Sequence, residues 1–304
     1  MITWVVGRGG LLGSAIHRQC AEPFDGSPVP WADPTAAANI LQSDAARFRA
    51  EAAGGPWAVI WAAGAATTST SAEQAEGELE TLRALLTALR DNPPAGRGAV
   101  FLTSSAGGVY AGSADPPFDA ATPPVALSPY GELKLRQEAL ATELLIGVCP
   151  LVIGRFSNLY GPGQNLTKLQ GLISRLALAA VTQQPINIFV PLDTIRDYIY
   201  VEDAASAALS AAARAATQPT DEPRILVIAS GQPATVGQVI RTMNQVTKRR
   251  VPVALGSHAS ASAQSMDLRL TPTVALDTTT PLPAGMKPVF LDILERVQRQ
   301  SLTG

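Results

Sequence analysis

Short apolar runs alternate with longer amphipathic segments through the first half of the chain. The apolar runs lie at 2–7, 27–31, 57–64, 98–105 and 150–158. Their near-continuous hydrophobicity is typical of strands that are buried on both faces of a parallel sheet. Helical spacing of apolar residues marks the segments at 11–21, 35–53, 79–90 and 130–147. This alternation predicts an α/β fold in which helices cover both faces of a doubly wound parallel sheet.

The alternation becomes less regular after about residue 156. A helix-like segment at 167–183 and a strand-like run at 224–231 belong to this second half. We expect residues 1–156, together with parts of 190–232, to form the first domain. Residues 157–304 should form mainly a smaller C-terminal α/β lobe that binds the substrate.

Composition narrows the class of protein. Of the 304 residues, 46% are hydrophobic and 16% are charged, which is typical of a globular domain. A net charge of −2 gives no reason to expect nucleic acid or an anionic membrane as a partner. The first residues lack the basic start of a signal peptide, and no run reaches the ~18 apolar residues of a membrane span. With two cysteines and two histidines in no ligand-like spacing, we expect a cytoplasmic enzyme without a metal site.

A glycine-rich turn follows the first predicted strand and opens the first predicted helix. In the stretch GRGGLLG at 7–13, glycines are spaced three apart. Such a turn lets the backbone approach a pyrophosphate, and the helix start favours its negative charge. The pattern predicts a Rossmann-type site for NAD or NADP. We expect its contacts to come from Gly7, Arg8, Gly10, Leu11, Leu12 and Gly13.

The second predicted strand should decide between the two cofactors. NAD sites usually end this strand with an acidic residue that binds the ribose hydroxyls. Trp31 stands in that region, with Asp33 just beyond it, and Arg8 lies inside the glycine turn. Because Arg8 could meet a 2′-phosphate, the sequence favours NADP slightly.

The stretch SPYGELK at 128–134 places a tyrosine and a lysine one helical turn apart. Tyr130 and Lys134 therefore leave the same face of the helix that starts near Ser128. The seven residues fit a surface contact as well as a proton donor with an adjacent cation. The rest of the chain has to decide between these two possibilities.

Together with the glycine turn and TSSAGGVY at 103–110, the YGELK stretch resembles the extended short-chain dehydrogenase/reductases, most of all their nucleotide-sugar epimerase/dehydratase branch. The resemblance runs from about residue 2 to the final helix. It implies a catalytic set of a serine with Tyr130 and Lys134. The lysine ammonium favours the phenolate that removes a hydroxyl proton, and the serine holds the reacting oxygen. Tyr130 and Lys134 are expected to contact the cofactor as well, as are Ala62 and Ala63.

The catalytic serine has two candidates. Counting back from Tyr110 puts the usual family position on Ala106, whereas counting forward to Tyr130 favours Ser105. We choose Ser105 and keep Ser104 as the alternative, with a role in substrate binding. If neither serine reaches the substrate, Tyr130 and Lys134 would have to work alone.

The second half of the chain carries two further stretches of the same resemblance. RFSNLYGPG at 155–163 implies that Asn158 and Tyr160 contact the substrate. RDYIYVEDAA at 196–205 implies that Arg196 binds the nucleotide phosphate, since a guanidinium fork suits that geometry. Arg269 is the nearest candidate for a second phosphate ligand.

The three residues after Ser105 narrow the reaction. Dehydratase relatives carry Asp-Glu there, but Ala106, Gly107 and Gly108 offer no acid or base. The resemblance then implies a nucleotide-sugar epimerase that acts at C4 through a transient ketone. A ketone reductase or dehydrogenase needs the same residues and is the alternative, followed by a non-catalytic NAD(P)-binding sensor.

Two expectations concern the helices around 79–90 and 133–145. Both have leucines beyond one core-facing stripe, and in the family the corresponding helices pair two subunits, so we expect a homodimer; a broad core face is the other explanation. Glu78 stands where the family usually has an asparagine that supports the cofactor site.

Overall fold

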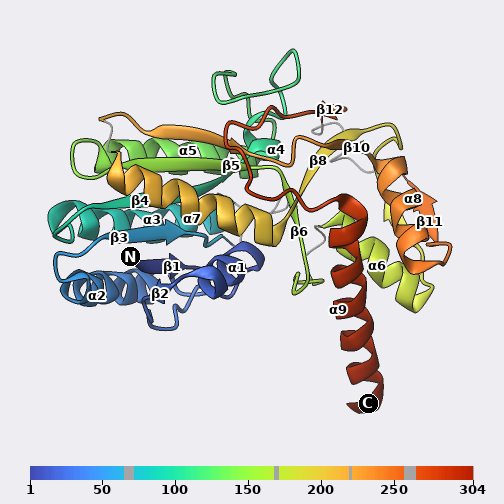
Figure 1. Ribbon diagram of the computed structural model, residues 1–304, viewed down its shortest axis with the longest axis horizontal. Helices are drawn as coiled ribbons and strands as arrows, with labels where there is room; N and C mark the ends of the chain where they lie inside the picture. The colour runs from blue at the N-terminus through green and yellow to red at the C-terminus, as the bar shows by residue number, and fades with distance from the viewer. Residues whose placement is uncertain (65–71, 168–170, 219–220, 257–264, 304) are drawn as a thin grey trace.

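The computed structural model describes residues 1–64, 72–167, 171–218, 221–256 and 265–303, and a six-stranded parallel sheet lies at its centre (Figure 1). In spatial order its strands are β2 (Glu22–Pro23), β1 (Ile2–Val6), β3 (Trp57–Trp61), β4 (Gly98–Ser105), β5 (Leu151–Phe156) and β9 (Arg224–Ile228). The strand order reverses between β1 and β3, as in a doubly wound sheet. The predicted Rossmann-type fold is confirmed.

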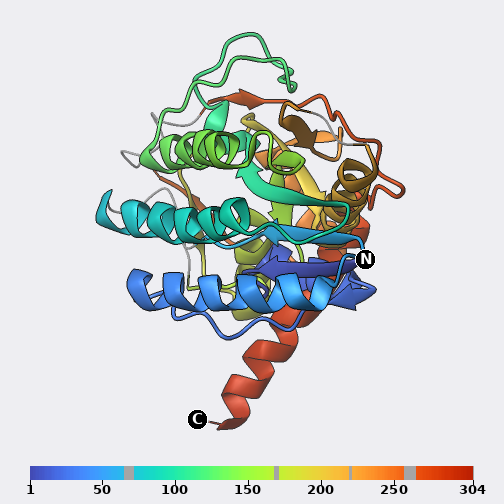
Figure 2. The same ribbon diagram turned by 90° about the vertical axis from the view of Figure 1, so that its left-hand side faces the viewer.

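Helices cover both faces of this sheet. Figure 2 shows three of them side by side on one face, namely α2 (Pro34–Ala52), α3 (Ala72–Asp91) and α5 (Pro129–Leu145). The opposite face is covered by α1 (Leu11–Gln19) and α7 (Val201–Thr217). Alternate strand residues supply the two cores, so Val59 packs under the first group of helices and Ile60 under the second. This double burial explains why the strands are apolar without interruption.

The rest of the chain forms a second layer beside the sheet. Its strands are β6 (Asn158–Tyr160), β7 (Ile186–Ile188), β8 (Ile195–Tyr200), β10 (Pro233–Thr235), β11 (Val253–Leu255) and β12 (Asp267–Leu268). β8 pairs with β6, β10 and β12, and β7 pairs with β11. The helices of this layer are α6 (Leu172–Thr182), α8 (Val236–Thr247) and α9 (Leu282–Thr303), which share one core. None of the described helices combines the length and the apolar character that a membrane span requires.

The second strand of the sheet lies earlier in the chain than the sequence predicts. The predicted strand at 27–31 is wrong, because β2 consists of Glu22 and Pro23, and the chain at 27–31 forms no strand. Pro28 and Pro30 have no N–H to donate to a neighbouring strand, which explains why this apolar run stays outside the sheet.

The leucines of α3 are buried within a single chain. Leu79, Leu82, Leu85, Leu86 and Leu89 all belong to the core under α2, α3 and α5. A broad core face therefore accounts for their number, and the homodimer stays a prediction without support from these positions.

A buried polar network fixes α5 to β4 and β5. Glu138 on α5 accepts hydrogen bonds from Ser104 at 2.5 Å and from two nitrogens of Arg155 at 2.6 and 3.0 Å. Arg155 also donates to the Tyr110 hydroxyl at 2.7 Å, and that hydroxyl donates to the Asp119 carbonyl. Each charged group has its partner inside the protein, so the helix has one well-defined position on the sheet.

The last helix is anchored on the loop that follows β6. Gly163 donates its backbone N–H to Asp292 at 2.9 Å, and Arg296 donates to the Gln164 carbonyl at the same distance. A Cβ at Gly285 would overlap the Tyr160 hydroxyl, so α9 approaches β6 at a place where only glycine fits.

Arg155→Met should destabilise the fold strongly. It leaves the Glu138 carboxylate buried without its cation, which costs about 3–5 kcal/mol of unfolding free energy. Urea denaturation at neutral pH measures the loss. Arg136→Met is the matched control, because the Arg136–Glu76 pair is exposed and should cost less than about 1 kcal/mol. Equal losses in the two variants would contradict this assignment.

Candidate functional site

The glycine turn packs against the end of β3. Gly7 has φ of +93°, and a Cβ there would lie 2.5 Å from the backbone nitrogen of Ala63. A Cβ at Gly13 would overlap the Gly7 carbonyl oxygen. Only glycine fits at these two positions, whereas Gly10 has an ordinary φ of −84° and caps α1. The turn therefore lies against Ala62 and Ala63 at the carboxyl end of β3, and α1 begins there with N–H groups that have no partner within the helix.

Of the two leucines in this turn, Leu12 is buried in the core under α1 and α7. Leu11 is partly buried against the same core. Their side chains are therefore used in packing, and contacts to a ligand would come from the backbone.

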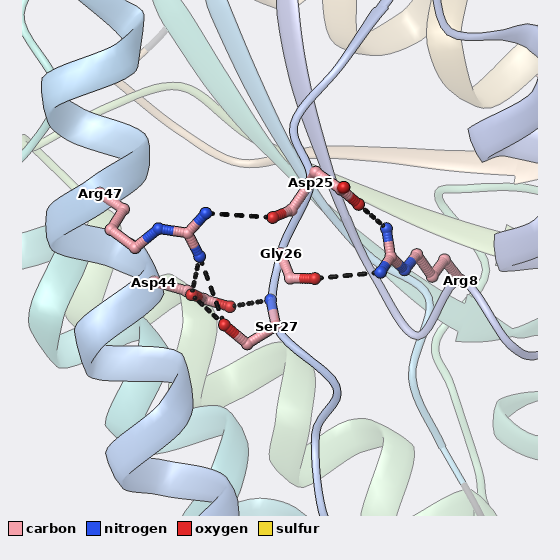
Figure 3. A network of polar contacts seen from close by, with 6 residues as sticks. All are labelled: Arg8, Asp25, Gly26, Ser27, Asp44 and Arg47. Carbon is pink, nitrogen blue, oxygen red and sulfur yellow. Dashed lines mark hydrogen bonds and ion pairs between the residues drawn. The ribbon is translucent and has the colours of Figure 1, made fainter.

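Asp25 is the acidic residue that follows the end of β2. The region of Trp31 was expected to hold that position. It follows the strand by two residues, and its side chain is 88% exposed. Figure 3 shows Arg8 turned toward it, with one guanidinium nitrogen paired to the Asp25 carboxylate and another donating to the Gly26 carbonyl at 3.1 Å. The hydrogen bond and charge of Arg8 lower the pKa of Asp25. Asp25 was missed because the strand was expected later in the chain.

The loop after Asp25 is held to α2 by a second set of polar contacts, also drawn in Figure 3. Asp44 accepts from the Ser27 backbone at 2.6 Å, from the Ser27 hydroxyl at 2.9 Å and from Arg47 at 2.6 Å. Arg47 reaches the Asp25 carbonyl at 3.3 Å. The backbone beside Asp25 is therefore fixed, while its carboxylate faces outward.

Trp31 and Asp33 do not lie at the end of a strand. The Trp31 ring is about half exposed and stands edge-on against Trp61, the last residue of β3, with the centroids 6.1 Å apart. Asp33 caps the start of α2 by accepting from the Ala36 N–H at 3.0 Å.

The two serines at the end of β4 face different surroundings. Ser104 is buried, and its hydroxyl is committed to Glu138. Ser105 is half-buried and caps the short helix α4 (Ala106–Val109) by accepting from the Gly108 N–H at 3.2 Å. A hydroxyl has one proton to donate, and that of Ser105 stays available for a ligand. Ala106, the other position that the family count suggests, is fully buried.

Two glycines bring α4 and α5 together beside Tyr130. A Cβ at Gly131 would overlap the Gly108 carbonyl, and one at Gly108 would lie 3.0 Å from the Tyr130 ring. The Tyr130 ring is half-buried, and the Lys134 ammonium lies 5.9 Å from its centroid. Ser105, at the end of β4, thus lies next to the contact between α4 and α5 at which Tyr130 stands, with Lys134 one turn further along α5.

Asn158 and Tyr160, two residues apart on β6, differ in their exposure to solvent. Asn158 is exposed at the start of β6 and donates to the Asp197 carbonyl at 2.9 Å. Tyr160 is buried in the core of the second layer, beside Tyr200. Burial raises the pKa of its hydroxyl, which lies against Gly285. As placed, Asn158 can meet a ligand, whereas the Tyr160 side chain is used in packing.

Of the two arginines expected to bind phosphate, Arg196 lies on β8 and Arg269 directly follows β12, the strand beside β8. Arg196 on β8 is 9% exposed and donates to the Ile195 carbonyl at 2.8 Å. Burial lowers its pKa, and among the described residues it forms no ion pair within 4 Å. β12 runs beside it, and Asp267 on that strand pairs with exposed Arg269 at 2.8 Å. Asp267 acts on Arg196 through charge without forming an ion pair with it, so the buried guanidinium is suited to an anionic ligand.

A cavity lies among β10, α8 and the start of α9. No sequence pattern predicted it. It measures about 350 Å³, and its lining includes Tyr198, Ser230, Gln238, Arg241 and Pro281. None of the predicted site residues lines it. In the part of the chain that the structure describes, no group of three metal-ligating side chains gathers.

Comparison with known proteins gives the family of the chain. Residues 3–229 match the NAD dependent epimerase/dehydratase family. The chain belongs to this family.

Two curated relatives match part of this chain. The first is a dTDP-L-rhamnose 4-epimerase of Burkholderia thailandensis, 33% identical over 125 residues, which are 40% of this chain and 32% of that protein. The second is a dTDP-4-dehydro-6-deoxyglucose reductase of Escherichia coli, 28% identical over 194 residues, which are 59% of this chain and 58% of that protein. The chain thus matches only about a third and somewhat over half of their lengths.

Solved structures show the same fold over nearly the whole chain. A UDP-glucose 4-epimerase of Thermotoga maritima with UDP-glucose has a TM-score of 0.79 at 18% identity, over 98% of this chain and all of that one. The UDP-glucose 4-epimerase of Thermus thermophilus with NAD has a TM-score of 0.74 at 20% identity, over 96% and 99%. TunA, an NDP-hexosamine 5,6-dehydratase, has a TM-score of 0.75 at 17% identity, over 97% and 98%.

Gly13→Ala should destabilise the protein, because the new methyl group would overlap the Gly7 carbonyl. We expect a loss of about 2 kcal/mol or more, the usual range for overpacking a tight contact. Thermal unfolding measures it. Gly9→Ala is the control, since nothing lies within 4 Å of a Cβ at Gly9. A Gly13→Ala variant as stable as Gly9→Ala would show that the turn is looser than described.

Proposed function

We propose that the protein is an NAD(P)-dependent nucleotide-sugar epimerase that inverts C4 of a hexose through a transient 4-keto intermediate. The observation that carries this proposal is the grouping of Ser105, Tyr130 and Lys134 at the carboxyl edge of β4, beside the glycine turn. Hydride exchange at a carbinol needs a base, a cation and a donor to the oxygen, and these residues supply all three.

The residues present fit a dinucleotide. The turn needs glycine at 7 and 13, the start of α1 offers free N–H groups, and the Asp25 carboxylate is exposed where β2 ends. Bound NAD(P) would accept a hydride from the sugar and return it to the opposite face. Gly7, Gly10 and Asp25 would hold the cofactor, and Lys134 would meet its nicotinamide half.

The chain's own groups account for the proton transfers. Tyr130 takes the proton from the sugar hydroxyl as the ketone forms and returns it at the end of the cycle. Lys134 stabilises the phenolate, and Ser105 donates its hydrogen bond to the reacting oxygen. Nothing lies within 4 Å of a Cβ at Gly107, so this side of the site has open space in which a ketone can turn.

The proposed substrate carries a diphosphate. Arg196, buried and without a carboxylate partner among the described residues, is the cation that would hold it. Asn158, exposed on the neighbouring strand β6, would contact the diphosphate or the sugar. Arg269 is paired with Asp267. It would therefore bind the diphosphate only if phosphate replaced Asp267 as its partner.

A keto-sugar reductase is the second candidate, and the E. coli reductase relative is the observation that favours it. Nucleotide released by denaturing the purified protein separates the two. An epimerase retains its cofactor through a redox-neutral cycle, whereas a reductase exchanges it at each turnover.

Tyr130→Phe should abolish turnover. UDP-glucose, UDP-galactose and dTDP-hexoses are the probes, and inversion at C4 is followed by NMR. Loss of the phenol should slow the reaction about 10²–10⁴-fold without unfolding the protein. Tyr200→Phe is the control, since Tyr200 packs against Tyr160 in the second layer. Full activity of Tyr130→Phe, or inversion of none of the probes by the native protein, would refute the proposal.

We further propose that NAD is preferred over NADP. The sequence favoured NADP slightly because Arg8 could meet a 2′-phosphate. In the structure Arg8 is paired with Asp25. An exposed carboxylate accepts hydrogen bonds from ribose hydroxyls and repels a 2′-phosphate.

Asp25→Asn should therefore shift the preference toward NADP. The change removes the repelling charge and releases Arg8, and one charge-assisted hydrogen bond corresponds to about tenfold in affinity. Fluorescence titration with NADH and NADPH measures the ratio. Glu22→Gln, on the strand that Asp25 follows but paired with the N-terminus, should leave it unchanged. An unchanged ratio in Asp25→Asn would remove Asp25 from the cofactor site.

A further inference from the structure

Glu78 brings a carboxylate into the group of residues around Lys134. It lies in the first part of α3, and its side chain is only 10% exposed. Its Oε1 lies 3.9 Å from the Lys134 ammonium, which is itself 7% exposed. The mechanism proposed above uses Lys134 but gives this buried acid no part.

A glutamine links the two charges. Gln137 is fully buried, accepts from the Lys134 ammonium at 2.9 Å, and donates its own N–H to Glu78 Oε1 at 2.9 Å. One side-chain amide thus fixes both the lysine and the glutamate. Because its carboxylate accepts a hydrogen bond from the Gln137 amide, the Glu78 side chain is held beside the Lys134 ammonium.

Gly64 makes room for this contact. It follows the β3 segment that borders the glycine turn, and a Cβ there would lie 3.2 Å from Glu78 Oε1 and 3.7 Å from the Lys134 ammonium. The carboxylate therefore approaches the same edge of the sheet as the cofactor-binding turn.

Resting on the proposed function, we infer that Glu78 is a positioning residue that sets the base strength of Tyr130. Through Gln137 it fixes the direction of the Lys134 side chain. Its negative charge offsets part of the ammonium's charge, so that Tyr130 gives up its proton less readily than it would beside Lys134 alone. A phenolate that is disfavoured in this way is the stronger base, so it takes the proton of the sugar hydroxyl more readily in the first half of the cycle.

The other charges packed around this group are neutralised by partners of their own. Glu138, one turn beyond Lys134, is paired with Arg155 from β5. Arg136 on the outer face of α5 pairs with Glu76 of α3. Ser105, from β4, presents a hydroxyl and no charge. Among the described residues, Glu78 is therefore the carboxylate that acts directly on Lys134.

Tyrosine absorbance gives a readout that needs no substrate. The chain has five tyrosines, and four of them ionise late, because burial raises the pKa of Tyr110, Tyr160, Tyr198 and Tyr200. The ionisation step of Tyr130 is identified by comparing an alkaline titration of the native protein with that of Tyr130→Phe.

Glu78→Gln separates charge from hydrogen bonding, because glutamine retains an oxygen that accepts from Gln137. We expect the midpoint assigned to Tyr130 to move toward acid by about 0.5–1 pH unit, since one negative charge is removed close to the Lys134 ammonium. Glu76→Gln is the matched control: it removes a carboxylate from the same helix pair on the exposed side, and its midpoint should stay in place. Thermal unfolding verifies that both variants are folded.

Lys134→Met separates this inference from the proposed function. The inference holds if Lys134→Met moves the midpoint toward base and Glu78→Gln moves it toward acid. A shift in Lys134→Met with none, or one toward base, in Glu78→Gln would overturn the role of Glu78 and leave the catalytic pair intact. An unmoved midpoint in Lys134→Met would instead refute the Tyr130–Lys134 pair and the proposed function with it.

Discussion

The buried ion pair between Glu138 and Arg155 fixes the geometry on which the candidate site depends. Tyr130, Lys134 and Glu138 follow one another at single-turn intervals on one face of α5. Anchoring Glu138 to β5 and to Ser104 of β4 therefore also sets the height and rotation of the tyrosine and the lysine. The adjoining residue, Ser105, ends the same strand. One network thus aligns the helix that carries the proposed base with the strand that carries the proposed hydrogen-bond donor.

Buried charge is handled in two ways in this protein. Arg155 has a carboxylate and a phenol within hydrogen-bonding distance, so its charge is matched inside the chain. Arg196 has a backbone carbonyl and, among the described residues, no carboxylate within ion-pair distance. The first arrangement serves stability, since removing one partner leaves an isolated charge. The second leaves a cation whose charge a ligand can neutralise.

Sequence patterns predicted what depends on periodicity and on glycine. The strands at 98–105 and 150–158 were recognisable because burial on both faces demands continuous apolar residues, and the turn at 7–13 because only glycine fits at two of its positions. β2 escaped prediction because two paired residues carry almost no pattern, and Asp25 was missed with it. The commitment of Ser104 to Glu138 joins residues 34 positions apart, and no local rule reveals such a contact.

The anchoring of α9 on the loop after β6 has a consequence for synthesis. The hydrogen bonds from Gly163 to Asp292 and from Arg296 to Gln164 join segments about 130 positions apart in the chain. During translation, the face of the sheet under α2, α3 and α5 can assemble early, whereas the opposite face waits for α7. The loop beside Asn158 must wait until the final helix has left the ribosome. The proposed cofactor site would therefore form before the proposed substrate site.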